Sequence, residues 1–371
     1  MVKQLTEKEK AKIRRKKAHQ MKRIEEGARI RKIKQSREWV TIRGLLGYTW
    51  AWFYALLGGR EAGKSYSVTE FFVRQWKFYG IPFTWLRLNE ASTKKLLNNN
   101  AEKLVDADIY RKYHLNLKVK GTDVYDGEKR MCTVLALSTF ANDKGVALFD
   151  KDFLKQICPG GKKMYYHIAL DEFQREKTQR SQGDICYQFV NQMENLVRST
   201  KERMRIFLIG NTLEECADIL TMFNFIPEEF GRYKIKKKRC VIDYMEPTDA
   251  YKARRAGTVG DILMGDQSNF TNKIDFDKSL VTKQRLIKPS YIILFDKRTK
   301  FTVWDGGIVA KFNGERCKQT IAMRPYQDCL YNQTLRDQVI QLFDARGFYY
   351  HDLITNKRFQ KEISIIKPRK Q

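Results

Sequence analysis

A short glycine-containing segment has the residues needed to hold phosphate groups. It matches G-x-x-x-x-G-K-[ST] at every position, after an apolar stretch and before a segment with helical spacing. In such loops the glycines let backbone N–H groups turn towards phosphates, and the helix start adds its positive dipole end. A plain glycine-rich turn is the alternative. We predict an ATP site in which Lys64 contacts the β- and γ-phosphates and Ser65 binds Mg²⁺. The loop comprises Gly58, Gly59, Arg60, Glu61, Ala62, Gly63, Lys64 and Ser65.

Two neighbouring carboxylates follow an apolar segment at residues 165–170. An acidic residue at the C-terminal end of a parallel strand faces the crevice where ligands bind. We therefore expect Asp171 to hold Mg²⁺ and Glu172 to act as the general base that polarises a water molecule. The alternative is an ordinary helix cap with an acidic first turn. The phosphate loop favours the catalytic interpretation.

A polar residue and a basic residue complete the candidate site. Asn211 comes two residues after the predicted strand 205–209 and could contact the γ-phosphate or the attacking water, although Asn is also common in turns. Arg198 lies near the end of a predicted helix, where it could serve a neighbouring subunit as a transition-state cation. Lys201, Arg203 and Arg205 are rivals, and a surface arginine near a helix C-terminus is the alternative.

The elements that must position these residues follow an α/β pattern. Apolar runs of strand length alternate with segments whose apolar residues recur at helical spacing, which indicates a parallel sheet with helices on both faces. The predicted strands are 50–57, 81–88, 134–137, 164–170 and 205–209, and the predicted helices are 65–80, 93–110 and 185–203.

The pattern changes after about residue 225. Six of the nine residues 231–239 are Lys or Arg, and 246–275 is polar with few large apolar groups. Segments 291–295, 301–304 and 308–312 predict a β-meander, followed by a helix at 334–345 and a basic tail. We expect four parts: a basic helical extension (1–40), an ATPase domain (41–228), a basic strand and linker subdomain (229–278) and a β-rich C-terminal domain (279–371).

The charge of the chain predicts a polyanionic partner. Its 371 residues include 71 Lys and Arg against 43 Asp and Glu, a net charge of +28. Residues 1–40 alone carry 15 Lys and Arg against 5 Glu, a net +10. No apolar run approaches the ~18 residues of a membrane-spanning helix, so we expect no membrane partner. Seven dispersed cysteines without a CxxC pair predict neither a zinc site nor a disulfide framework, and suit a reducing compartment.

The motifs and their order resemble one family. GGREAGKS at 58–65, HIALDEF at 167–173, the helix leading to Arg198 and IGNT at 209–212 are similar to the DNA-packaging ATPase of short-tailed, protein-primed phages of the phi-twenty-nine type. The resemblance implies a P-loop ATPase fold with an additional catalytic-glutamate strand, and a C-terminal domain like an RNase H-type nuclease that has lost cleavage. It also implies a homopentameric ring at the portal vertex of a capsid, in the host cytoplasm, with Arg198 acting in trans.

The resemblance is incomplete in two places. Lys144 is the nearest match to a lysine that assists nucleotide exchange in relatives, but the long 141–163 segment weakens this transfer. The basic extension departs from the family pattern, and involvement of a structural RNA stays open. The candidate nuclease carboxylates Asp296, Asp305, Asp328 and Asp337 are dispersed along a short domain, so we expect a binding domain that does not cleave.

These features predict an ATP-driven motor that moves double-stranded DNA into a preformed viral capsid. One alternative is a P-loop DNA helicase or a cellular DNA-pumping ATPase, which would separate strands or act without a capsid. The other is a basic structural protein that binds nucleic acid and uses nucleotide only as a switch. That protein would show no steady ATP turnover.

Overall fold

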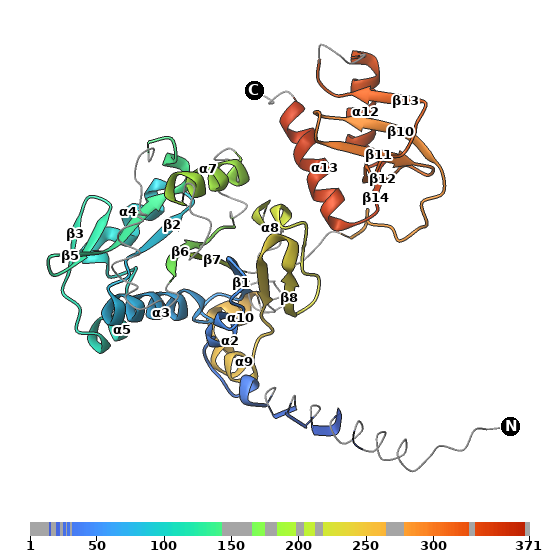
Figure 1. Cartoon of the computed structure of the whole chain (residues 1–371). Coiled ribbons are helices and arrows are strands. Elements are labelled where there is room, and N and C mark those ends of the chain that lie inside the picture. The colour runs from blue at the N-terminus through green and yellow to red at the C-terminus, as the bar shows by residue number, and fades with distance from the viewer. Residues whose placement is uncertain are drawn as a thin grey trace. The chain divides into compact units, whose positions relative to one another are not determined.

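The computed structural model describes most of the chain as two compact units (Figure 1). The described residues are 32–142, 165–174, 184–197, 204–211, 218–264, 278–325 and 331–367, with isolated short stretches before residue 32. One unit comprises Met1–Leu213 and Glu229–Lys273, and the other Glu214–Glu228 and Ile274–Gln371. Within the described part of the chain, no helix combines the length and apolarity needed to cross a membrane.

The first unit is built on a nine-stranded sheet in the order β3-β4-β5-β2-β6-β7-β1-β9-β8. The central strands from β5 to β9 in that order run parallel, whereas β3, β4 and β8 are antiparallel to their neighbours. The strands are β1 (Phe53–Gly58), β2 (Phe83–Arg87), β3 (Leu117–Lys120), β4 (Asp123–Asp126), β5 (Lys129–Ala136), β6 (Tyr166–Asp171), β7 (Met204–Asn211), β8 (Gly231–Ile235) and β9 (Cys240–Tyr244).

Helices cover both faces of this sheet. Tyr54 of β1 faces a core that includes Phe71 and Phe72 of α3, whereas its neighbour Phe53 points to the other face and meets Phe189 of α7. Successive strand residues alternate faces, so β1 is buried on both sides, as its unbroken apolar run predicts. The helices are α2 (Arg43–Leu46), α3 (Lys64–Tyr79), α4 (Glu90–Ala101), α5 (Ala107–Lys112), α7 (Ile185–Val197), α9 (Asp249–Arg255) and α10 (Val259–Met264), with 3₁₀ turns η1 (Leu137–Thr139) and η2 (Lys236–Lys238).

The second unit contains a five-stranded sheet in the order β13-β10-β11-β12-β14. The meander β10-β11-β12 is antiparallel as predicted, and β13 and β14 add parallel edges. Two helices share one core cluster with residues on one face of this sheet, including Phe359 beside Phe295 and Phe301. The elements are α8 (Asp218–Met222), β10 (Pro289–Leu294), β11 (Lys300–Trp304), β12 (Ile308–Lys311), β13 (Gln319–Ala322), α12 (Gln333–Asp344), β14 (Tyr349–Tyr350) and α13 (Leu353–Ile366).

Several local predictions were wrong. The helix expected at 93–110 is two helices, because Asn99 and Asn100 adopt a left-handed backbone at the end of α4. The hairpin β3-β4 was not predicted. Residues 231–239, predicted as a basic strand, do form the strand β8 and the turn leading into β9, and β9 pairs with β1 in the first sheet. The expected basic tail contains the helix α13.

Candidate active site

The phosphate loop joins the end of β1 to the start of α3, as its motif predicts. Gly58 ends the strand, and Lys64 begins the helix directly after Gly63. Gly63 has a φ of +81°, a left-handed backbone that favours glycine. A Cβ at this position would also lie only 3.1 Å from the Trp39 ring. Conformation and packing both therefore call for glycine at the point where the helix starts.

Lys64 lies inside the loop rather than in solvent. Its side chain is buried, and Nζ donates to the carbonyl oxygens of Gly58 at 3.0 Å and Gly59 at 2.5 Å. It also donates to Oδ1 of Asn211 at 3.1 Å. Burial lowers the pKa of Lys64 to about 8, although the nearby Asp171 carboxyl opposes this shift. The amine is thus held on the loop in a place where a bound anion would stabilise its positive charge.

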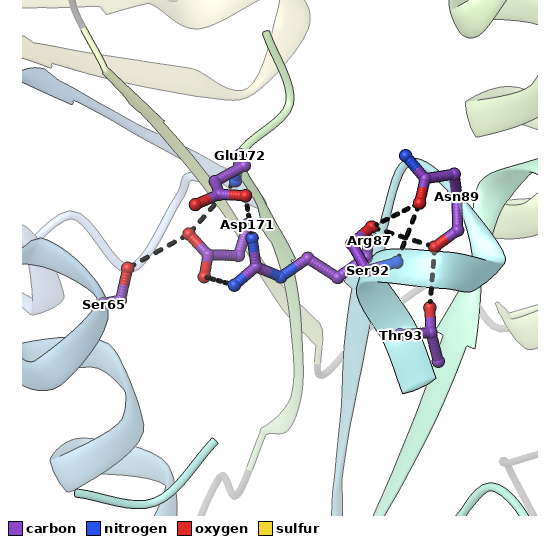
Figure 2. Close-up of polar contacts among 7 residues, drawn as sticks. All are labelled: Ser65, Arg87, Asn89, Ser92, Thr93, Asp171 and Glu172. Atoms are coloured by element: carbon purple, nitrogen blue, oxygen red, sulfur yellow. Dashed lines mark hydrogen bonds and ion pairs between the residues drawn. The ribbon is translucent and has the colours of Figure 1, made fainter. Parts of the chain in front are cut away.

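Ser65 and Asp171 meet although they come from distant segments. Ser65 Oγ donates to Asp171 Oδ1 at 3.0 Å, and Figure 2 shows the two side chains pointing towards each other. β7 separates β1 from β6 in the sheet, so Asp171, at the C-terminal tip of β6, reaches across to the first turn of α3. A hydroxyl and a carboxylate placed together provide the oxygen ligands that Mg²⁺ prefers.

Arg87 is a member of the site that the sequence analysis missed. It ends β2 and forms ion pairs with Asp171, at 3.2 Å, and with Glu172 (Figure 2). Asn89, two residues further on, caps α4 by accepting from the Ser92 N–H at 2.8 Å, which fixes the end of β2. The sequence signal that could have identified Arg87 is its position near the C-terminal end of the predicted strand 81–88.

The electrostatics of Asp171 depend on this arginine. Burial raises the pKa of Asp171, and the Arg87 guanidinium counteracts that rise. The side chain of Asp171 is 6% exposed and that of Arg87 is 12% exposed, so solvent screens this pair weakly. The arginine is therefore the main positive charge that compensates the buried carboxyl.

Glu172 has a different environment from its neighbour. Its backbone has a φ of +54°, and its side chain is 61% exposed at the edge of the cavity. The next residue, Phe173, is buried against Gly210, and its N–H donates to the Ile209 carbonyl at 3.3 Å. Phe173 therefore anchors the segment that turns Glu172 outward.

A cavity of about 430 Å³ contains most of the predicted residues. It brings together the phosphate loop, both carboxylates and the tip of β7, because the C-terminal ends of parallel strands meet at one sheet edge. The lining residues are Arg60, Glu61, Ala62, Gly63, Lys64, Ser65, Tyr66, Asp171, Glu172, Ile209, Gly210 and Asn211.

Two segments outside the motif hold the loop from its outer side. Val40 N–H donates to the Ala62 carbonyl at 2.9 Å, which joins the end of the basic extension to the loop. From α9, Tyr251 Oη donates to the Arg60 carbonyl at 2.8 Å and Arg254 donates to the Glu61 carbonyl at 2.6 Å. These contacts fix the backbone of the loop.

A second cavity, of about 300 Å³, shares Ala62 with the first. Trp39, Tyr244, Met245, Pro247 and Tyr251 contribute apolar surface to it. The Arg254 guanidinium lies 4.0 Å from the centre of the Trp39 ring and holds this aromatic wall in place. A flat apolar group could therefore bind next to the phosphate loop.

Some predicted residues lie outside the described part of the chain. These are Arg198, Lys144, Lys201, Arg203 and Asp328. Arg205, the rival of Arg198 that the structure describes, is the second residue of β7, and its guanidinium lies 4.1 Å from the centre of the Tyr165 ring.

The carboxylates considered for a nuclease site have other contacts. Asp296 accepts from the backbone of Arg298 and Thr299, and Asp305 accepts from Ser290. Asp337 pairs with Arg336. Among all residues that the structure describes, no group of three or more His, Cys, Asp or Glu side chains could hold a metal ion.

Comparison with protein families decides the assignment. The model of the podovirus DNA encapsidation protein (Gp16) matches residues 44–337. The chain belongs to this family. Membership assigns it to viral DNA encapsidation, which confirms the resemblance and the packaging function inferred from its motifs. No curated protein sequence matches the chain.

Solved structures show the same fold. The Phi-28 gp11 DNA packaging motor aligns with a TM-score of 0.63 at 14% identity, covering 91% of this chain and 100% of that chain. The bacteriophage Phi-29 viral genome packaging motor assembly aligns with a TM-score of 0.61 at 16% identity, covering 89% and 100%. The expected class, an α/β P-loop fold with a β-rich C-terminal part, is confirmed.

Proposed function

We propose that this encapsidation protein is the ATP-hydrolysing subunit of a motor that drives double-stranded DNA into a preformed capsid. The contact between Ser65 and Asp171, with the buried Lys64 amine on the same loop, carries this proposal. These three groups come from a loop and a strand tip that only the folded sheet brings together. Phosphoryl transfer uses this set of groups.

The residues of the cavity fit a magnesium nucleotide. Ser65 and Asp171 would hold Mg²⁺, since both offer oxygen atoms at one point of the cavity. The bound ion would supply positive charge that stabilises the charge developing on the transferred phosphoryl group. The backbone N–H groups of the loop and Lys64 bind the phosphates, and the second cavity accommodates the base through its aromatic wall.

Glu172 and Asn211 act on the attacking water in this proposal. Glu172 lies at the edge of the cavity, where it orients the water and accepts its proton. Arg87 pairs with Glu172 and so controls the direction of its carboxylate. Asn211 contacts Lys64 and can hydrogen-bond to the γ-phosphate.

The remaining roles extend the same proposal to an assembly. The subunits form a ring, with a pentamer as the expected size, at the portal vertex of the capsid in the host cytoplasm. Arg198 of one subunit completes the site of its neighbour, and Lys144 assists nucleotide exchange. The partners are double-stranded DNA, the portal and other copies of this chain.

DNA-stimulated ATP turnover of Glu172→Gln beside the wild type tests the proposal. We expect kcat to fall by about 10²–10⁴-fold, the usual contribution of a general base, while the KD for ATP changes little. Glu102→Gln is the control, since Glu102 is an exposed carboxylate outside the cavity. Normal turnover by Glu172→Gln, or a wild type whose turnover DNA does not raise, would contradict the proposal.

A further inference from the structure

The turn between β8 and β9 carries four consecutive cations, Lys236, Lys237, Lys238 and Arg239. The three lysines form the 3₁₀ turn η2, Arg239 follows with a φ of +48°, and all four side chains are exposed. No acidic side chain in the described part of the chain forms an ion pair with them. The turn is therefore a concentrated positive charge that no carboxylate among the described residues neutralises.

Protection of the sheet edge does not explain this charge. β8 is an edge strand, and lysine on such a strand prevents pairing with another chain. That role suits Lys234, which lies on β8 itself. Arg232 is also accounted for, because it pairs with Asp243 at 2.7 Å. Lys236–Lys238 lie beyond the last residue of the strand, where no edge needs protection.

Aromatic residues and backbone hydrogen bonds fix the turn in place. The Arg239 guanidinium lies 4.3 Å from the centre of the Trp52 ring, and Lys234 Nζ lies 5.0 Å from that of Tyr48. The Arg239 carbonyl accepts from the N–H groups of Trp52, at 2.8 Å, and Phe53, at 3.0 Å. The charged turn is thus attached directly to the start of β1.

We propose that the β8–β9 turn, Lys236–Arg239, binds the phosphate backbone of double-stranded DNA. Ammonium groups on flexible stems are suited to phosphates and carry no sequence information, as a packaged genome requires. β1 begins next to this turn and ends at the phosphate loop, so DNA would bind at the N-terminal ends of the parallel strands and nucleotide at their C-terminal ends. The inference rests on the proposed function, which makes double-stranded DNA the polyanion that is moved.

The salt dependence of duplex binding tests the turn directly. The variant carries Lys236→Gln, Lys237→Gln and Lys238→Gln and retains Arg239, whose guanidinium packs on the Trp52 ring. Loss of three phosphate contacts should reduce the slope of log K against log salt by about 2.7. Between ~50 and ~200 mM salt, the wild type should then lose about 40-fold more affinity than the variant. Fluorescence anisotropy with a labelled duplex of mixed sequence, without nucleotide, measures both.

A charge-matched variant separates the turn from net charge. Lys95→Gln, Lys103→Gln and Lys118→Gln remove three exposed lysines at the β3 end of the same sheet, and should leave the slope near that of the wild type. The proposal is overturned if the turn variant keeps the wild-type slope of log K against log salt, or if this slope becomes equally shallower in both variants. It is also overturned if only binding to duplex RNA is weakened.

The same measurement is independent of the ATPase proposal. Because the anisotropy measurement is made without nucleotide, it reports DNA binding even if the wild type hydrolyses no ATP. A wild type without DNA-stimulated turnover would contradict the proposed function, whereas an unchanged slope would contradict the role of the turn. Basal ATP turnover of the turn variant should equal that of the wild type.

Discussion

Gly210 should tolerate no larger side chain, because the ring of Phe173 lies against it. A Cβ at Gly210 would lie 2.7 Å from Cε1 and 2.8 Å from Cζ of that ring. Carbon atoms in contact prefer about 3.5–4.0 Å, so the methyl group of Gly210→Ala would be about 1 Å too close. Phe173 is buried and cannot move into solvent. The ring and the backbone that carries it must therefore shift.

Stability and turnover should both respond. Forcing an extra methyl group into a packed core costs about 1–3 kcal/mol of unfolding free energy. Phe173 directly follows Glu172, so the shift also moves the proposed general base. A displacement of about 1 Å can reduce kcat by about 10²-fold. We therefore expect a modest loss of stability together with a disproportionate loss of turnover.

Urea unfolding and DNA-stimulated ATPase assays measure the two effects. Gly47→Ala is the control, because Gly47 has an ordinary φ of −67° and no atom lies within 4 Å of its added Cβ. Adding Phe173→Leu to Gly210→Ala removes the clashing ring atoms, and should recover part of the stability as a favourable coupling of about 0.5–3 kcal/mol. If Gly210→Ala were as stable and as active as the wild type, the packing argument for Glu172 would be refuted.

Three further predictions concern charge. Arg87→Gln should lower the unfolding free energy by about 3 kcal/mol in urea titrations, because it leaves the buried Asp171 carboxylate without its cation. Arg87→Lys keeps a positive charge and should recover part of that loss. Burial lowers the pKa of Lys64 to about 8, whereas an unfolded lysine titrates near 10.4. Between these two pH values the unfolded chain binds more protons than the folded chain. The unfolding free energy of the wild type relative to Lys64→Met should therefore rise by about 3 kcal/mol as the pH increases from about 8 to about 10.4. Equal pH slopes for wild type and Lys64→Met would contradict that cause. Burial also lowers the pKa of His167 well below its usual value, so the unfolded chain takes up a proton first as the pH falls. The stability of the wild type relative to His167→Leu should therefore fall as the pH is lowered below about 6.5, as urea unfolding at each pH can show.

Local patterns predicted the central part of the fold. The apolar run before Gly58 and the helical spacing after Ser65 are properties of short segments, and both elements formed as expected. The hairpin β3-β4 was missed because its four-residue strands contain lysines and aspartates and bury little. The helix α13 was missed because basic residues surround its apolar positions. Phe359 and Ile363 become recognisable as a stripe only against the core that they complete.

The candidate site likewise combines residues that local sequence patterns predict with residues that only tertiary packing brings together. The motif identified the loop and the two carboxylates, because their chemistry depends on neighbours in sequence. Arg87 belongs to no motif, and its role depends on β2 lying next to β6 in the sheet. The contact of Trp39 with Gly63 joins residues from separate segments and depends likewise on tertiary packing. Sequence spacing could not provide either relation.

The position of β1 has a mechanical consequence. Each of its residues is registered with one of β7, and Phe53–Leu57 are also registered with β9. Sliding β1 along its axis would require hydrogen bonds on both sides to break together, so the strand resists a pull along its length as a stiff rod. A load applied to the β8–β9 turn would therefore reach the phosphate loop with little stretch. Tension on DNA bound at this turn, as we propose, would then act directly on the proposed ATP site.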